Sequence, residues 1–186
     1  DVIGAASTKP FGFQSFRHGP GVGGHCIPID PNYLSYNVRT KLGYPFRFVE
    51  LAQEINNNMP AYVARRVQDL LNRDCKAVRG ASVLLLGVTY KPNIADVRES
   101  PAAPLAKCLI DAGANVSFHD PYVKNWTVAG HDLTSESDLY GAVADADACV
   151  LLQNHTDYDV DALALCSRRF LDTRGIARRS ATVERL

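Results

Sequence analysis

The sequence lacks the cysteine patterns that indicate a disulfide framework or a zinc site. Its five cysteines are widely spaced, and none of them belongs to a Cys-x-x-Cys pair. Zinc sites use such close pairs, and small secreted proteins pair an even number of cysteines. We therefore expect no metal site and a reducing, cytoplasmic compartment.

An excess of one charge sign and a long apolar run are also missing. The 20 Lys and Arg residues balance the 20 Asp and Glu residues, so no basic surface for nucleic acid is indicated. No apolar run approaches the roughly 20 residues that span a membrane, and the first residues do not resemble a signal peptide. We expect neither nucleic acid nor a membrane as a partner.

Methionine is nearly absent, because Met59 is the only one in the chain. The chain opens with Asp1-Val-Ile-Gly-Ala-Ala, which is typical of the middle of a helix. We expect a piece of something longer, either a truncation or one half of a pair of chains. Its 186 residues suit one large domain or a small domain with an appendage.

Residues 19–31 read Gly-Pro-Gly-Val-Gly-Gly-His-Cys-Ile-Pro-Ile-Asp-Pro and are named the thiol loop below. Its glycines allow a backbone to approach a ligand closely, and its prolines fix the path of the chain. Cys26 is a candidate nucleophile, because a reactive thiol needs exposure and surroundings that favour the thiolate. The alternative is a tight turn with an incidental cysteine. Asp30 is a candidate base for hydrolysis and a candidate helix cap.

The thiol loop also contains a match to the dinucleotide-binding pattern, at Gly19, Gly21 and Gly24. That pattern requires a preceding strand and a following helix, whose N-terminus holds the pyrophosphate. The preceding residues 9–18 are irregular and aromatic, and prolines follow. We therefore reject the match.

Helical patterns dominate the next part of the chain. A short helix is expected at 31–42, with Asp30 as its cap. Apolar residues then recur at helical spacing between residues 46 and 71. Pro60 interrupts this run, which predicts a kink or two abutting helices. Such a helix joins domains or packs on a partner subunit, unless it packs on its own domain.

From residue 80 onward, predicted strands alternate with predicted helices. Strands are expected at 82–88, 115–119, 146–152 and 169–172, with helices at 101–111, 136–144 and 159–166. This alternation predicts an α/β fold with a parallel sheet and right-handed crossovers. The expected units are a cysteine-loop segment, a bridging or dimerisation helix, and a Rossmann-like lobe, at 1–44, 45–79 and 80–186.

Three cations follow predicted strands. Lys91 and Arg98 lie after the first strand, and Arg174 lies after the fourth. Ligands of parallel sheets bind at the carboxyl ends of the strands, and cations there suit an anionic ligand. Each of the three can also be read as a solvated surface charge.

Three segments together resemble one family. They are GPGVGGHCIPIDP at 19–31, GVTYKPNIADVRESPA at 87–102 and LDTRG at 171–175. They resemble the nucleotide-sugar 6-dehydrogenases of the UDP-glucose/GDP-mannose dehydrogenase group, over essentially the whole chain. The stretches KPFGF and HCIPIDP are most similar to the UDP-N-acetylhexosamine branch.

The resemblance implies a four-electron oxidation of the C6 alcohol of a UDP-sugar to a uronic acid, with NAD as cofactor. Cys26 matches the cysteine that adds to the aldehyde and later carries a thioester. Asp30 matches an aspartate that assists water or proton transfer. Covalent capture of this kind splits one difficult oxidation into easier steps.

The same resemblance implies roles for four further residues. Lys91 matches a lysine that contacts the nucleotide sugar, and Arg174 an arginine at its nucleotide end. Gly23 matches a glycine that brings a backbone amide to the sugar. Arg98 matches an arginine that reaches NAD across a domain cleft. The long helix is implied to form much of the core of a homodimer.

The family's N-terminal NAD domain is missing from this chain, as are its catalytic lysine, asparagine and glutamate. We therefore expect the chain alone to be inactive. One alternative is a non-catalytic module for UDP-sugar binding or dimerisation. Another is a thiol hydrolase that uses Cys26, which is disfavoured because no histidine is placed as its base. His25 adjoins Cys26, but adjacent side chains usually point apart.

Overall fold

The computed structural model describes residues 2–186, and Asp1 lies outside the described part. The helices are α1 (Val2–Ala6), α2 (Asp30–Leu42), α3 (Arg47–Arg73), α4 (Ala102–Asp111), α5 (Leu139–Asp145) and α6 (Val160–Cys166). The strands are β1 (Ser82–Leu86), β2 (Asn115–His119), β3 (Asn125–Val128), β4 (His131–Thr134), β5 (Ala148–Leu151), β6 (Phe170–Asp172) and β7 (Val183–Arg185). In this part of the chain, no helix combines the length and the apolarity that a membrane crossing requires.

Five strands form a parallel sheet in the order β2-β1-β5-β6-β7. Strand β1 pairs with β2, from Ser82 opposite Asn115 to Leu86 opposite His119, and with β5 on its other side. After β1 the chain forms the edge strand β2, and it then crosses back to add β5, β6 and β7 on the other side of β1. The carboxyl ends of β1 and β5 mark the switch point, where open α/β sheets bind ligands. The predicted α/β class and parallel sheet are confirmed.

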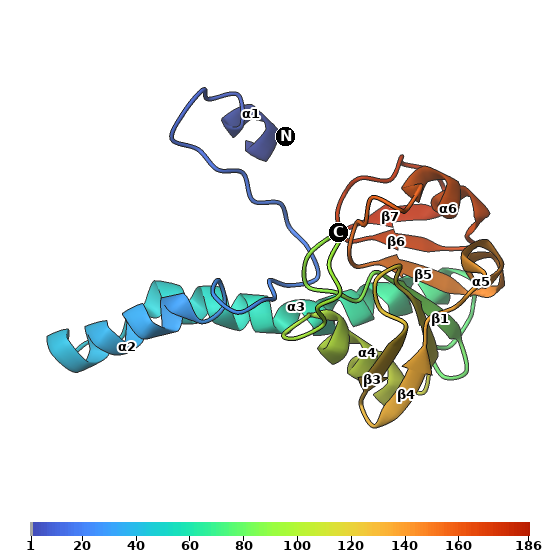
Figure 1. Cartoon of the computed structure of the whole chain (residues 1–186), viewed down its shortest axis with the longest axis horizontal. Coiled ribbons are helices and arrows are strands. Elements are labelled where there is room, and N and C mark those ends of the chain that lie inside the picture. Colours follow the sequence, from blue (N-terminus) through green and yellow to red (C-terminus); the bar gives the residue numbers. More distant parts are fainter. Residues whose placement is uncertain (1) are drawn as a thin grey trace.

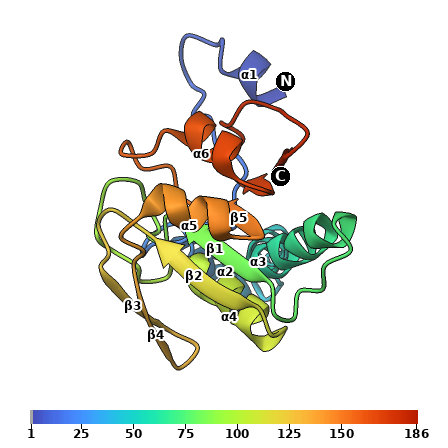
Figure 2. The same ribbon diagram turned by 90° about the vertical axis from the view of Figure 1, so that its right-hand side faces the viewer.

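Helices cover both faces of the sheet, as Figures 1 and 2 show. Val83 and Leu85 face the cluster that includes residues of α3 and α4. Leu84 and Leu86 belong to the opposite cluster, which includes residues of α5 and α6. Successive strand residues point to opposite faces, so the unbroken apolar run in β1 reflects burial on both faces.

The long helix α3 runs through Pro60 as one helix, so of the two predicted alternatives, a kink and two abutting helices, the second is wrong. An interior proline costs about 3 kcal/mol, and packing on the sheet offsets this cost. Val63, Val67 and Leu70 lie in the core. The N-terminal half of α3 extends away from the sheet beside α2 (Figure 1).

Two features of the sheet region were not predicted. The hairpin β3–β4 turns at Ala129 and Gly130, whose φ values are 51° and 80°. This geometry is typical of the tight turns that Asn-Gly signals, and Ala-Gly gives no such signal. Strand β7 has only three residues, too few for a visible alternation. The predicted strand 82–88 ends at Leu86 because Gly87 adopts a φ of 75°.

Candidate functional site

A cleft of about 730 Å³ lies between the thiol loop, the N-terminal half of α3 and the loops that follow β1 and β6. Three of the six predicted site residues line it: Gly23, Lys91 and Arg174. Ile27 and Pro28 also line the cleft, although Cys26 does not. The sheet therefore brings the two cations together with the thiol loop, as strand-end placement predicts.

The cleft is cationic on one side and apolar on the other. Its cations are Lys91, Arg174 and Arg17, and none of the described residues that line it is Asp or Glu. The apolar wall comes mainly from α3, through Phe48, Val49, Ala52, Ile55 and Met59. A cleft with this distribution fits an anionic ligand that also carries an apolar or flat part.

Arg174 is fixed by both its backbone and its side chain. Its Nε donates to the carbonyl of Leu152 over 2.6 Å, and its backbone N–H donates to Asp172 Oδ1 over 2.8 Å. Burial lowers the pKa of Arg174, and the charge of Asp172 opposes that effect. A Cβ on Gly19 would lie 2.9 Å from a terminal guanidinium nitrogen. Gly19 thus lets the thiol loop pack directly on Arg174.

Asp172 organises the loop that presents Arg174. Its side chain is fully buried. Besides the N–H of Arg174, its carboxylate accepts the N–H of Gly175 over 2.9 Å and that of Ala177 over 2.7 Å. Asp172 lies inside the 171–175 segment, yet sequence reasoning assigned it no role. A lone Asp at the end of the apolar strand β6 is the sequence signal that identifies it in hindsight.

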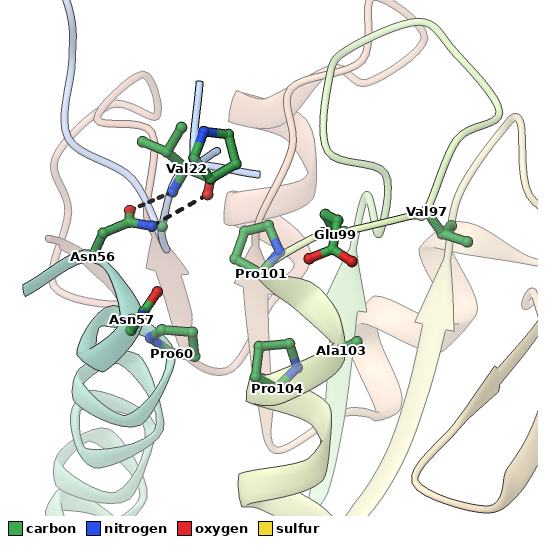
Figure 3. A pocket seen from close by; sticks show the side chains of 12 residues that line it. Val22, Asn56, Asn57, Pro60, Val97, Glu99, Pro101, Ala103 and Pro104 are labelled. Atoms are coloured by element: carbon green, nitrogen blue, oxygen red, sulfur yellow. Dashed lines mark hydrogen bonds between the residues drawn. The ribbon is translucent and has the colours of Figure 1, made fainter. Parts of the chain in front are cut away.

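Asn56 of α3 holds the thiol loop in place (Figure 3). Its Oδ1 accepts the N–H of Val22 over 2.7 Å, and its Nδ2 donates to the Val22 carbonyl over 3.3 Å. The side-chain amide thus pairs with both backbone groups of one residue. A hollow of about 320 Å³ continues from here toward Glu99 and Pro104. Sequence reasoning missed Asn56, because nothing distinguishes it from its neighbours Asn57 and Asn58.

Gly23 has a packing reason to be glycine. A Cβ at this position would overlap the carbonyl oxygen of Glu99, and it would lie 3.1 Å from Cδ of Pro101. The thiol loop therefore lies directly against the segment that leads into α4. This contact places Gly23 beside the cleft whatever its role toward a ligand.

Replacing Gly23 by alanine is expected to displace the thiol loop. The added methyl group meets a backbone carbonyl, which cannot rotate away, and overpacking of this kind costs about 1–3 kcal/mol. Amide hydrogen exchange in residues 19–31 should become faster. The matched control is Gly4→Ala in α1, where nothing lies within 4 Å of the new Cβ. Unchanged exchange in Gly23→Ala would contradict the packing.

Cys26 lies in the turn that leads into α2, and its thiol is free and exposed. Its carbonyl accepts the N–H of Ile29 over 3.0 Å and that of Asp30 over 2.8 Å. This turn makes Ile29 the N-cap, so the prediction that Asp30 caps the helix is wrong; Asp30 is its first residue. The neighbouring His25 has its Nε2 3.7 Å from Asp96 Oδ2.

Arg98 lies outside the cleft lining, exposed on the loop after β1. Its Nε and a terminal nitrogen donate to the two carboxylate oxygens of Asp96, over 3.0 and 2.8 Å. These hydrogen bonds hold the pKa of Asp96 well below its usual range. Across residues 2–186, no cluster of three or more His, Cys, Asp or Glu could hold a metal ion.

The cysteines are expected to differ sharply in reactivity. Burial raises the pKa of Cys149 to about 12, so its thiol should react with a disulfide reagent only after denaturation. Cys26 should react in the folded protein. Cys26→Ser should therefore remove one thiol from the native count. Cys149→Ser should remove one only from the denatured count. The reverse pattern would place Cys26 inside the fold.

Family models match both parts of the chain. Residues 84–179 match the UDP-binding domain of the UDP-glucose/GDP-mannose dehydrogenase family, and residues 1–58 match its central domain. The first range contains Lys91 and Arg174, and the second contains the thiol loop. The cleft therefore lies between segments that belong to two domains of one family.

Relatives agree with the family models. A UDP-N-acetyl-D-mannosamine dehydrogenase from Methanocaldococcus jannaschii is 32% identical over 88% of this chain and 36% of its own length. A UDP-glucose 6-dehydrogenase from Rhizobium meliloti is 34% identical over 89% of this chain and 39% of its own length. The similarity to the N-acetylhexosamine branch is confirmed by the first of these names.

Solved structures show the same fold. The structure of a UDP-D-ManNAc dehydrogenase from Pyrococcus horikoshii superposes with a TM-score of 0.80 and 26% identity, covering 99% of this chain and 43% of that one. The chain thus spans about two fifths of the length of the relatives it matches. From its motifs, its fold and these matches, the chain belongs to the UDP-glucose/GDP-mannose dehydrogenase family.

Proposed function

We propose that this chain is the substrate-side part of an NAD-dependent UDP-sugar 6-dehydrogenase and that its cleft holds the UDP-sugar. The observation that carries the proposal is the charge of the cleft, in which three cations stand without a carboxylate among the described lining residues. A diphosphate placed there gains charge-assisted hydrogen bonds. The relatives' names, which all specify dehydrogenases in the cases above, do not favour a non-catalytic module.

Arg174 and Lys91 are assigned to different parts of the ligand. Arg174, anchored on Leu152 and Asp172, contacts the nucleotide end. Lys91 is exposed on the loop after β1 and reaches the sugar side of the diphosphate. Gly23 offers a backbone amide to the sugar, and its lack of a side chain keeps that amide accessible.

The chemistry assigned to this chain is the chemistry of a thiol. The Cys26 thiolate adds to the aldehyde carbonyl at C6, the C=O double bond becomes a single bond, and its oxygen takes up a proton to give a hemithioacetal. The hydride lost when this group is oxidised to the thioester would pass to NAD, which has no main site in residues 2–186. Water then attacks C6, the C–S bond breaks, and the sulfur leaves as thiolate. Asp30, four residues away on the first turn of α2, accepts the proton of that water. The position of Cys26 next to the cleft-lining Ile27 and Pro28 supports this assignment.

We propose that residues 2–186 hold no main site for NAD. The pattern at Gly19, Gly21 and Gly24 is followed by a turn and lacks the flanking strand and helix of a dinucleotide site. Arg98, which we assign to NAD, is exposed and paired with Asp96. We therefore expect no oxidation of a UDP-sugar by this chain alone, because the oxidant has no main site here.

The segment at residues 45–79, which contains α3, is proposed to form the interface of a homodimer. Leu51 on α3 is 54% exposed, and α2 presents Tyr33 and Leu34 at 66% and 52%. Large apolar side chains left exposed on neighbouring helices are candidates for an interaction surface. Sedimentation velocity on the chain and on Leu51→Glu tests this: the variant should shift toward monomer, and identical profiles would contradict the proposal.

The binding proposal is tested by calorimetric titration of UDP into the chain and into Lys91→Ala and Arg174→Ala. Loss of a charge-assisted hydrogen bond costs about 1.5–3 kcal/mol, so each variant should bind roughly 10- to 100-fold more weakly. The control is Lys107→Ala, because Lys107 pairs with Asp111 on the solvent-facing side of α4. Equal UDP affinity in all four proteins would contradict the proposal, because Lys91 and Arg174 would then be surface charges that do not bind the ligand.

A further inference from the structure

A buried polar cluster lies where β1, β2 and β5 end, at the switch point of the sheet. It consists of Thr89, Asp120 and His155, whose residues are 2%, 4% and 0% exposed. The rings of Tyr122 and Tyr158 pack on His155, with centroids 5.1 and 5.5 Å away. None of these residues lines the cleft, and the proposed chemistry uses none of them.

The hydrogen bonds of His155 fix its tautomer. Its Nδ1 lies 2.9 Å from the backbone nitrogen of Asn93 and accepts that N–H. A neutral ring that accepts at Nδ1 carries its proton on Nε2. Nε2 lies 3.1 Å from Asp120 Oδ2 and 3.3 Å from Thr89 Oγ1. The ring therefore donates to Asp120 and accepts from Asn93.

Asp120 is held in turn by the ends of two strands. Its carboxylate accepts the N–H of Val88 over 2.8 Å and the N–H of Tyr122 over 2.9 Å. Burial opposes the ionised form, but the hydrogen bonds from His155 and these two amides outweigh it and lower the pKa of Asp120. The orientation of the His155 ring is thus set by backbone groups in the segments that directly follow β1 and β2.

The other end of the ring holds the loop that carries Lys91. Asn93 has a φ of 62°, in the left-handed region that asparagine adopts more readily than most other residues with a side chain. Its side-chain Oδ1 also accepts the N–H of Thr156 over 2.9 Å. Thr89 Oγ1 donates to the carbonyl of Lys91 over 2.9 Å. Lys91 thus stands between two residues that the cluster fixes, although its own side chain is exposed.

We propose that His155 is the positioning residue for Lys91, by accepting the Asn93 N–H while Asp120 holds the ring in the required tautomer. The inference rests on the proposed function, since it gives a reason why an exposed lysine on an irregular loop lines the cleft. Preorganisation of this kind removes part of the ordering cost of binding.

Two substitutions of similar size separate this role from simple packing. His155→Asn keeps an acceptor near the position of Nδ1, because both groups branch from Cγ. His155→Gln keeps a polar group near the position of Nε2 and loses the acceptor for Asn93. Both variants remove ring packing on Tyr122 and Tyr158, so their melting temperatures should fall by similar amounts.

The experiment measures UDP affinity and amide hydrogen exchange in residues 89–94 for the full 186-residue chain and both variants. His155→Gln should bind UDP about tenfold more weakly than His155→Asn and should exchange faster in 89–94. If affinity and exchange change equally in both variants, His155 is only a packing residue. If the unsubstituted chain does not bind UDP, the proposed function fails, and the exchange data alone still decide whether His155 positions the loop.

Discussion

Replacing Asp172 by alanine is expected to lower the free energy of unfolding by about 3–5 kcal/mol. The carboxylate accepts the backbone N–H groups of Arg174, Gly175 and Ala177, and alanine leaves all three without that acceptor. Arg185 Nε, 4.0 Å from Oδ2, would lose its nearby counter-charge as well. The loop that presents Arg174 should loosen, so UDP affinity should fall together with stability.

Urea unfolding followed by the fluorescence of Trp126, the only tryptophan, measures the effect. Asp172→Asn should fall between the wild type and the alanine variant, because one acceptor oxygen remains. Asp111→Ala is the control, since Asp111 pairs with Lys107 on the surface and exposed pairs contribute about 0–1 kcal/mol. If Asp172→Ala and Asp111→Ala unfold at the same urea concentration, the buried carboxylate does not organise the loop.

Replacing Gly87 by alanine is expected to lower the free energy of unfolding by about 2–4 kcal/mol, which is the second large effect. Gly87 has a φ of 75°, and its new Cβ would lie 2.6 Å from the carbonyl oxygen of Gln153. Gly87 and the Gln153 carbonyl lie in backbone segments at the switch point, where β1 gives way to the Lys91 loop. Neither segment can move without disturbing the sheet.

Gly80→Ala provides a matched control for the clash. Gly80 has a φ of 80°, but nothing lies within 4 Å of its added Cβ. Gly80→Ala should therefore lower the free energy of unfolding only by the cost of placing alanine at a positive φ, about 1–2 kcal/mol. Equal destabilisation of the two variants in urea would show that Gly87 is required for its φ alone. A larger loss at Gly87 supports the close approach of the two loops.

The fold was predictable to the extent that its elements have a strong period. The buried runs at 82–86 and 148–151 and the helical spacing of α3 led to the correct class and element order. The hairpin β3–β4 was not predicted because its turn, Ala129-Gly130, gives no turn signal. Strand β7 was not predicted because it has only three residues. The alternative of two abutting helices at Pro60 was wrong, because tertiary packing of Val63 and Val67 overrides the local preference against proline.

The candidate site was predictable where chemistry and strand ends coincide. Lys91 and Arg174 follow strands of one parallel sheet, so topology alone brings them to one edge. Asn56, Asp120 and His155 could not be found this way, because their partners lie 34, 32 and 62 residues away in sequence. Only the folded chain shows which backbone groups they hold.

The measurement that tests the central claim most directly is calorimetric titration of the chain with UDP, UDP-N-acetylglucosamine and NAD. The account predicts that both UDP ligands bind and that NAD does not, because the cationic cleft is complete and the dinucleotide site is not. Binding of NAD without UDP would contradict it. So would binding of none of the three, because Lys91 and Arg174 would then not form a nucleotide-sugar site in this chain.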